Sequence, residues 1–395
     1  MLRHAVKLIW NRKRANGLIV TELVIAFLIV FIVSALGAHT LYKWRLPLGF
    51  EWEETVEVMM SRGGRWTEDD GLTLRRLLAT VRDQPEVEWA HSTMPLFRNW
   101  RWTTSVAHEG QSTQTMLSAM TDGAPQDLGV ELLEGRWFDE GDAAEGVFPV
   151  LIDERLRDSL FPDGVILGAN INKTDPEDSD QREWRVIGVF RAFRQMGEFT
   201  ALKPYLIGRF ATEDLEESTE TLAVRLQAGT PIDFEERLQR IIEAEAPHWK
   251  LSITPLSKLR ERQIKDYVLP LAISGLVAGF LLLMVAFGLF GVLWQNVTRR
   301  TDELGLRRAL GSTRRRIYQQ IVLETVVMAG LAALIGVVIG LQFPLSGGFS
   351  ALDWRASSTG LAASLATLMT LAGLCSLYPA WLAAQRAPAD ALHYE

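Results

Sequence analysis

The sequence lacks most of what enzymes and disulfide-stabilised domains need. It contains one cysteine, Cys375, so no disulfide framework or cysteine-based zinc site can form within one chain. The six histidines form no metal-spaced pair, and H-E-x-x-H and G-x-S-x-G motifs are absent. The sequence also has no G-x-x-x-x-G-K-[ST] phosphate loop. We therefore expect no catalytic residue, no metal site and no bound cofactor.

Charge is unevenly distributed along the chain. Segment 41–266 contains 27 Lys and Arg against 41 Asp and Glu, a net charge of −14. The remaining residues contain 14 basic and 7 acidic side chains, a net charge of +7. Since 48% of all residues are hydrophobic, this split indicates an acidic water-exposed body joined to basic membrane flanks. Such an acidic body would repel phosphates, which excludes nucleic acid as a partner.

Four apolar segments are long enough to cross a lipid bilayer, which takes about 20 mostly apolar residues per helix. They predict spans at 18–38, 268–294, 321–341 and 359–379. Residues 257–267 are polar and contain no proline or glycine, so 257–294 is expected to form one helix that emerges from the bilayer as a stalk. The first segment has a basic start but no A-x-A cleavage site, which favours an uncleaved anchor over a signal peptide.

Basic residues in the short loops predict the orientation, because such loops stay in the cytoplasm. Residues 1–17 carry five Lys and Arg, loop 295–320 carries seven arginines, and loop 342–358 carries only Arg355. The N-terminus, loop 295–320 and the C-terminal residues 380–395 are therefore expected inside. Segment 39–256 and loop 342–358 are expected outside.

The large segment 39–256 is predicted to be a mixed α/β domain. Runs of β-forming residues bounded by turn signals predict strands at Phe148–Ile152, Trp184–Phe190 and Leu222–Leu226. Helical patterns occur at Leu72–Arg82 and Asp233–Ala244. The order of the strands in their sheet cannot be derived from these patterns.

Three further stretches of sequence have alternative interpretations. Arg98–Trp102 alternates arginine and tryptophan, which favours a strand with one aromatic face over a ligand-stacking site. Segment 172–182 is predicted to be a polar loop. Leu345–Phe349 (LSGGF) is similar to the LSGGQ signature of ABC ATPases, but without a phosphate loop a Gly-Gly turn between two membrane helices explains it better.

Charged and small residues inside the predicted spans are candidate functional positions. Glu22 and Glu324 are the only charges there, and each lies near the cytoplasmic edge of its apolar run. At that depth each could reach an arginine of a basic loop, or water, and we favour a structural ion pair or a helix-end role over a proton path. Two G-x-x-x-G pairs permit close helix contact and supply candidate dimer surfaces; they are Gly275 with Gly279 and Gly336 with Gly340.

The basic inner loop contains a familiar motif. Thr301–Ser312 (TDELGLRRALGS) resembles the R-x-x-E-I-G-[LI]-R-[RK]-A-[LV]-G-A motif of FtsX-like and MacB-type permeases, with Leu304 and Ser312 replacing the usual Ile and Ala. The end of the chain, Pro379–Leu392, resembles the same family's P-A-x-x-A terminus. In the outer domain, Leu133–Phe138 (LEGRWF) is similar to the L-x-x-G-R-x-F of the MacB type.

The resemblance implies a type VII, mechanotransmission ABC transporter permease with an FtsX-like permease domain at about 268–388. It also implies an inner-membrane protein whose segment 39–256 is a periplasmic domain of the MacB type. Two permease subunits, identical or related, would dimerise and couple to a cytoplasmic ABC ATPase dimer that binds ATP. MacB-type proteins often carry the ATPase before the first span, and few residues precede it here, so a separate ATPase is expected. The coupling residues implied are Glu303, Leu304, Gly305, Arg307, Arg308 and Gly311. A basic loop lying on the lipid surface is the alternative for this segment.

Three functions fit this family. The first is efflux or export, for which a periplasmic adaptor would be a further partner. The second is mechanical signalling of the FtsX type, which activates a cell-wall hydrolase and transports nothing. The third is lipoprotein release. The size of the outer domain and its Gly135-Arg136 motif resemble the MacB type more than FtsX, which favours export.

Overall fold

The computed structural model describes residues 13–385 except for nine short segments. These are 62–66, 100–101, 145–146, 163–165, 175–182, 211–220, 301–305, 307–309 and 346–353. The chain divides into two compact units. The helical unit comprises Met1–Lys43 and Val268–Glu395, and the α/β unit comprises Trp44–Tyr267.

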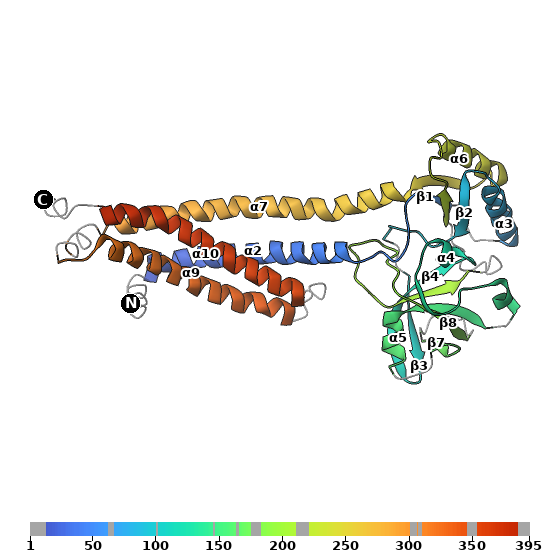
Figure 1. The fold of residues 1–395 in the computed structure, drawn as a ribbon, viewed down its shortest axis with the longest axis horizontal. Helices are drawn as coiled ribbons and strands as arrows, with labels where there is room; N and C mark the ends of the chain where they lie inside the picture. The colour runs from blue at the N-terminus through green and yellow to red at the C-terminus, as the bar shows by residue number, and fades with distance from the viewer. Residues whose placement is uncertain are drawn as a thin grey trace. The chain divides into compact units, whose positions relative to one another are not determined.

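Four long helices carry the apolar segments (Figure 1). They are α2 (Lys13–Arg45), α7 (Leu256–Thr298), α9 (Arg314–Leu345) and α10 (Trp354–Gln385). Their most apolar windows have mean hydropathies of 2.8, 2.7, 2.4 and 1.7. At about 1.5 Å per residue each helix exceeds a hydrocarbon layer of roughly 30 Å. The predicted four-span architecture is confirmed, and the predicted stalk helix 257–294 lies within the continuous helix α7.

The helical unit packs around bulky residues of α2. Four buried residues spaced by four line one face of this helix: Ile19, Leu23, Phe27 and Phe31. Small residues of the neighbouring helices belong to the same cluster, among them Ala329 of α9 and Ala372 of α10. Pairing large with small side chains lets helix backbones approach closely, as is common in membrane bundles.

The first sheet of the α/β unit is antiparallel, with the strand order β11-β1-β10-β2. Its strands are β1 (Thr55–Ser61), β2 (Val87–Ser92), β10 (Thr221–Leu226) and β11 (Lys250–Pro255). Helices α3 (Glu68–Arg82) and α6 (Phe234–Glu245) supply apolar side chains to its core, including Leu77 and Leu238. Sheet and helices thus share one hydrophobic core.

The second sheet is inserted between β2 and β10, with the order β5-β8-β6-β9-β4-β3-β7. Its strands are β3 (Thr103–His108), β4 (Gln111–Met120), β5 (Leu132–Gly135), β6 (Phe148–Asp153), β7 (Asn170–Lys173), β8 (Trp184–Phe190) and β9 (Tyr205–Arg209). Because β7 pairs with both β3 and β8, the sheet closes on itself. Three short helices accompany it: α4 (Ala124–Asp127), η1 (Glu140–Ala144) and α5 (Glu154–Leu160).

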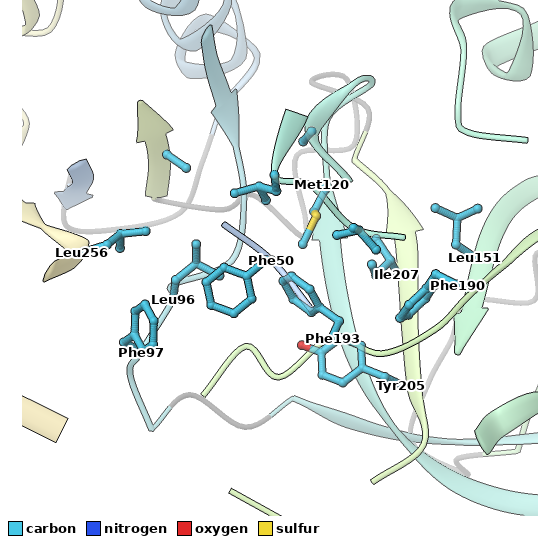
Figure 2. Close-up of a cluster of buried hydrophobic side chains, with 14 of the residues drawn as sticks. Phe50, Leu96, Phe97, Met120, Leu151, Phe190, Phe193, Tyr205, Ile207 and Leu256 are labelled. Atoms are coloured by element: carbon cyan, nitrogen blue, oxygen red, sulfur yellow. The ribbon is translucent and has the colours of Figure 1, made fainter. Parts of the chain in front are cut away.

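A further apolar cluster joins segments that are distant in sequence (Figure 2). Phe50 follows α2, Phe193 follows β8, Tyr205 begins β9 and Leu256 begins α7. The ring centroids of Phe50 and Phe193 lie 5.2 Å apart, and those of Phe193 and Tyr205 lie 5.3 Å apart. This cluster brings the second sheet against the chain segments that lead to the two longest helices.

Most of the elements predicted from sequence are present. The strands expected at 148–152, 184–190 and 222–226 correspond to β6, β8 and β10. The helices expected at 72–82 and 233–244 correspond to α3 and α6. These confirm the mixed α/β prediction for this part of the chain.

Two local predictions are wrong. Arg98 and Asn99 lie outside any strand, because the Arg98 side chain turns to form a 2.6 Å ion pair with the buried Glu57. Asn172 and Lys173 end strand β7 and so do not belong to a loop, since β7 pairs with β3. Residues 100–101, 175–182 and the Gly-Gly pair at 347–348 lie outside the described residues.

Candidate functional site

The segment between α7 and α9 is the candidate coupling site, and its two ends are described. Glu303, Leu304, Gly305, Arg307 and Arg308 lie outside the described residues. At the second end, the Leu310 N–H donates to the Leu306 carbonyl at 3.0 Å. Gly311 follows with φ +93°, a conformation that glycine adopts without strain and that commonly ends a helix.

A small apolar cluster fixes the helix ends on either side of this segment. Val297 at the end of α7, Ile317 at the start of α9 and Ala383 near the end of α10 are buried together, and Ile321 packs against them. The segment therefore begins and ends on a base built from three of the long helices.

An ion pair reinforces this base. Arg300 Nη1 lies 3.1 Å from Glu324 Oε2 of α9, and Gln320 Nε2 donates to Glu324 Oε1 at 3.0 Å. Both charged side chains are less than one-fifth exposed, at 17% and 16%. The sequence-based expectation that Glu324 pairs with an arginine of the basic loop is confirmed. The pair ties the last residue before the 301–305 segment to α9.

The Glu22 carboxylate has different surroundings from that of Glu324. It lies against the backbone of α7, since a Cβ added at Gly288 would meet Glu22 Oε1 at 2.6 Å. A larger residue at position 288 would displace the end of the Glu22 side chain from this position. The expected arginine partner of Glu22 stays a prediction.

The two glycine pairs also differ. A Cβ at Gly336 would lie 2.4 Å from Phe27 Cδ1, and one at Gly340 would lie 3.3 Å from a methyl group of Leu361. This pair therefore permits close helix contact within the chain. Around Gly275 and Gly279, by contrast, the described part of the chain places no atom within 4 Å of an added Cβ. Within the described part of the chain, Gly275 and Gly279 therefore make no close helix contact, and their role in a dimer surface stays a prediction.

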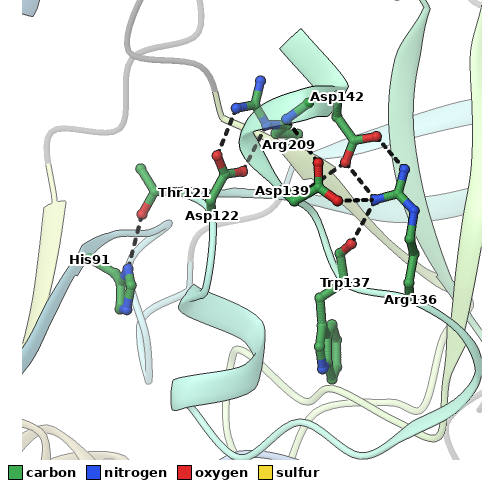
Figure 3. Close-up of polar contacts among 9 residues, drawn as sticks. His91, Thr121, Asp122, Arg136, Trp137, Asp139, Asp142 and Arg209 are labelled. Carbon is green, nitrogen blue, oxygen red and sulfur yellow. Dashed lines mark hydrogen bonds and ion pairs between the residues drawn. The ribbon is translucent and has the colours of Figure 1, made fainter.

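The Gly135-Arg136 motif has an architectural role in the α/β unit. Gly135 has φ +83°, and a Cβ there would lie 2.2 Å from the Ile187 carbonyl oxygen of β8. Arg136 makes two bonds to Asp142, at 2.5 and 2.8 Å, and one to Asp139 at 3.2 Å (Figure 3). The Arg136 guanidinium lowers the pKa of the Asp142 carboxyl. The motif thus pins β5 to β8 and orders the turn that follows.

Sequence reasoning missed a polar group in the loop between β8 and β9. Arg194 and Glu198 are buried there, with exposures of 4% and 3%. In an acidic domain, scattered charges are normally taken for solvated surface. The available signal was local: these charges stand between Phe193 and Phe199, around the turn-forming Gly197.

Two family models match the chain. The MacB-like periplasmic core domain matches residues 18–241, which is more than half of the sequence, and the FtsX-like permease C-terminal domain matches residues 275–388. The chain belongs to the MacB-like ABC transporter permeases. This confirms the resemblance carried by Thr301–Ser312 and Leu133–Phe138.

This MacB-like permease has relatives among curated proteins and solved structures. An uncharacterized ABC transporter permease of Bacillus subtilis, YvrN, is 26% identical over 283 residues, 67% of each chain. The macrolide export ATP-binding/permease protein MacB of Agrobacterium fabrum is 26% identical over 86% of this chain, which spans only 52% of that protein. The periplasmic region of MacB from Actinobacillus actinomycetemcomitans aligns with 54% of this chain and 94% of its own at 14% identity, with a TM-score of 0.40.

The family assignment covers the candidate site of this MacB-like permease. The FtsX-like match at 275–388 includes the end of α7, the whole 295–320 loop, α9 and most of α10. Four apolar helices together with a MacB-like periplasmic core are typical of an inner-membrane protein with a periplasmic domain.

Proposed function

We propose that this chain is the transmembrane subunit that couples ATP hydrolysis by a separate cytoplasmic ABC ATPase dimer to movement of its periplasmic α/β unit, in efflux or export. The supporting observation is the base of the 301–311 segment. The Arg300–Glu324 pair and the Val297–Ile317 contact hold both ends of that segment. A displacement of the segment would therefore act on both α7 and α9.

Helix α7 supplies the route from this base. It runs without interruption from Leu256, where the α/β unit ends its strand β11, to Thr298 beside the coupling segment. The helix contains one proline, Pro270, whose missing N–H removes one backbone hydrogen bond, but it stays helical on both sides of this residue and so links the two ends directly. The family-type motif at one end and the periplasmic core at the other give this helix a coupling role.

The proposed orientation follows from the arginines. With both termini in the cytoplasm, the arginine-rich loop 295–320 lies on the side of the ATPase and the acidic unit lies in the periplasm. Arginine can make paired hydrogen bonds to partner carboxylates, which suits Arg307 and Arg308 for docking. ATP would be bound by the ATPase, and this chain would hold no cofactor.

A second permease subunit, identical or related, is the proposed partner along α7. Exposed apolar residues recur on this helix at alternating spacings of four and three: Leu269, Ile273, Leu276, Phe280, Leu283 and Phe287. This spacing is the seam pattern of paired helices. The open glycines Gly275 and Gly279 lie within the same stretch and would let a partner helix approach.

Export is favoured over FtsX-type signalling and lipoprotein release because the periplasmic unit matches the MacB-like core. A periplasmic adaptor would then be a further partner. The alternatives share the same cytoplasmic coupling, so tests of docking apply to all three.

A docking experiment tests the coupling proposal. A tagged chain would be purified from native membranes with its ABC ATPase, beside the Arg307→Glu/Arg308→Glu variant. We expect ATPase recovery to fall roughly tenfold, the equivalent of 1.4 kcal/mol, while membrane insertion is retained. The matched control is Arg314→Glu/Arg315→Glu, in the same loop but within α9. Equal retention of the ATPase by both variants would show that the loop merely lies on lipid.

A further inference from the structure

The two sheets of the α/β unit are connected to the long helices in different ways. α2 leads into β1, and β11 leads directly into α7, so the first sheet is continuous with both helices along the backbone. The second sheet lies between β2 and β10 in sequence, so the backbone connects it to the helices only through the first sheet. For the second sheet to move with the helices directly, it needs a side-chain connection of its own.

The loop between β8 and β9, residues 191–204, makes such a connection to the segment that follows α2. We call it the clasp loop. The backbone N–H of Arg194 donates to the Leu48 carbonyl at 2.9 Å. Its guanidinium Nη1 donates to the Leu46 carbonyl at 3.1 Å. One clasp-loop residue thus binds two carbonyls just beyond the end of α2.

The clasp loop also contacts side chains in the first turns of α7. Arg260 Nε lies 2.5 Å from Glu198 Oε1. The side-chain amide of Gln263 donates to the Met196 carbonyl. Gly197, between these two positions, has φ +86°, and a Cβ there would overlap the Gln263 amide. The loop backbone therefore fits closely against one face of α7.

An aromatic residue of the clasp loop contacts both helices at once. Phe199 stacks on Trp44 of α2 with ring centroids 5.7 Å apart, and on Tyr267 of α7 with centroids 4.8 Å apart. The Arg260 guanidinium lies over the ring of Trp44 at 5.2 Å and over that of Trp52 at 4.6 Å. Polar and aromatic contacts thus converge on the same two helix ends.

These contacts are costly to build, which distinguishes the clasp loop from an ordinary connection. Buried charges destabilise a fold unless they are paired and hydrogen-bonded. Burial lowers the pKa of Arg194 to about 10, so at neutral pH it remains a cation inside the protein. Glu198 is equally buried and is neutralised by Arg260 across the loop–helix contact. A loop that merely connects β8 to β9 would need none of these buried charged groups.

We propose that the clasp loop is a fixed joint that makes the second sheet follow the ends of α2 and α7, with Glu198 and Arg260 as its positioning pair. The inference rests on the proposed coupling function, because it concerns how helix movement reaches the periplasmic unit. The first sheet follows the helices through the backbone, and the second follows them through this joint.

Distance measurements on the full chain test the joint. In a Cys375→Ser background, spin labels at Arg262→Cys and Ser159→Cys report on α7 and the second sheet, and labels at Arg262→Cys and Glu243→Cys report on α7 and the first sheet. The unaltered joint should give narrow distributions for both pairs, with and without ATP and vanadate. In Glu198→Gln and Arg260→Gln, the second-sheet distribution should broaden about twofold while the first-sheet distribution stays narrow.

Two comparisons exclude a general loss of structure. The double variant should broaden the second-sheet distribution no more than either single variant, because both remove one contact. Asp122→Asn with Arg209→Gln removes a similar pair, 2.7 Å apart at both contacts, that lies away from the clasp loop, and it should change neither distribution. Equal broadening at both sheets, or none in the clasp variants, would overturn the joint. If the unaltered chain does not co-purify with its ATPase, that result contradicts the proposed coupling function but leaves the joint unaffected.

Discussion

Arg300, two residues beyond the end of α7, forms a 3.1 Å ion pair with Glu324, about three turns into α9. Arg300 is the last residue described before the family-type segment, and Glu324 lies within a predicted membrane span. A carboxylate at this depth is stabilised by a nearby cation, and the cation in turn is held in one place. The pair therefore fixes the position from which the coupling segment starts.

Removing this carboxylate charge should loosen the segment. In Glu324→Gln, Arg300 keeps an acceptor but loses its charged partner, which we expect to cost about 1–3 kcal/mol of stability. Recovery of the ABC ATPase with the tagged chain should fall several-fold. Thermal unfolding in detergent and quantitative pull-down measure the two effects. Glu261→Gln, which removes the exposed pair with Lys265 on α7, is the control and should leave both unchanged.

Gly336 should tolerate no larger residue. In Gly336→Val, the added side chain would collide with Phe27, whose ring carbon lies 2.4 Å from the Cβ position. Overpacking of this kind costs about 1–3 kcal/mol. Size-exclusion chromatography of the detergent-solubilised chain should show less folded protein. Gly373→Val is a matched control in α10, because no described atom lies within 4 Å of its Cβ position; equal losses in both variants would contradict the packing argument.

Association between subunits should depend on the open glycines of α7. Gly275→Leu with Gly279→Leu adds bulk where the described residues of the same chain make no contact, so the single subunit should keep its fold. Cross-linking of two subunits along α7 should decrease, because leucine holds partner backbones apart. Undiminished cross-linking would place the subunit contact on another face.

Local patterns predicted the elements well, because each is encoded within a few residues. The run Trp184–Phe190 is rich in β-forming side chains and became β8, and the uninterrupted 257–294 pattern lies within α7. The ion pair of Glu324 was also predictable, since a charge near the edge of a span and an arginine-rich loop adjoin in sequence. The conformation of Gly311 follows from its place after a helix-forming run.

Long-range arrangements were not predictable from these patterns. The insertion of one sheet into another pairs β2 with β10, more than a hundred residues apart. The clasp loop combines Trp44, Arg194 and Arg260, and nothing in their separate neighbourhoods indicates that they meet. Arg98 shows the same limit, because its partner Glu57 lies on β1, 41 residues away in the sequence.

His91 should make the fold less stable in mild acid. It is buried, its Nε2 lies 2.7 Å from Asp127, and Arg82 and the Thr121 hydroxyl approach its Nδ1 at 3.3 Å. Burial, together with the charge of Arg82, lowers the pKa of His91 in spite of the nearby carboxylates of Asp127 and Asp122.

The direction of this pH dependence follows from proton binding. The unfolded chain takes up this proton near pH 6.5, whereas the folded chain resists it, so stability falls as the pH drops below about 6.5. His91→Gln should flatten the dependence of the unfolding midpoint on pH in this range. The exposed His248→Gln is the control, and a slope that survives His91→Gln would assign the effect to other groups.

Asp153 should have the opposite dependence on pH. Its Oδ1 accepts the backbone N–H groups of Leu156 and Tyr205, each at 2.9 Å, and so caps α5 and ties it to β9. Burial nevertheless raises the pKa of this carboxyl to about 6, because these two hydrogen bonds and the Arg155 guanidinium, 3.7 Å away, offset the burial only partly.

Because the folded-state pKa of Asp153 lies above the unfolded value of 3.8, its stabilising contribution is complete below about pH 4 and is lost as the pH rises through about 6. The difference corresponds to about 3 kcal/mol above that range. Asn at position 153 keeps an acceptor for both N–H groups and is an equally good helix cap, but carries no charge. Asp153→Asn should therefore raise the unfolding midpoint at about pH 7.5 by several degrees and leave it unchanged at about pH 4. Asp158→Asn, an exposed carboxylate on the same helix, should change neither value; a destabilised Asp153→Asn at neutral pH would mean that the charge itself is needed there.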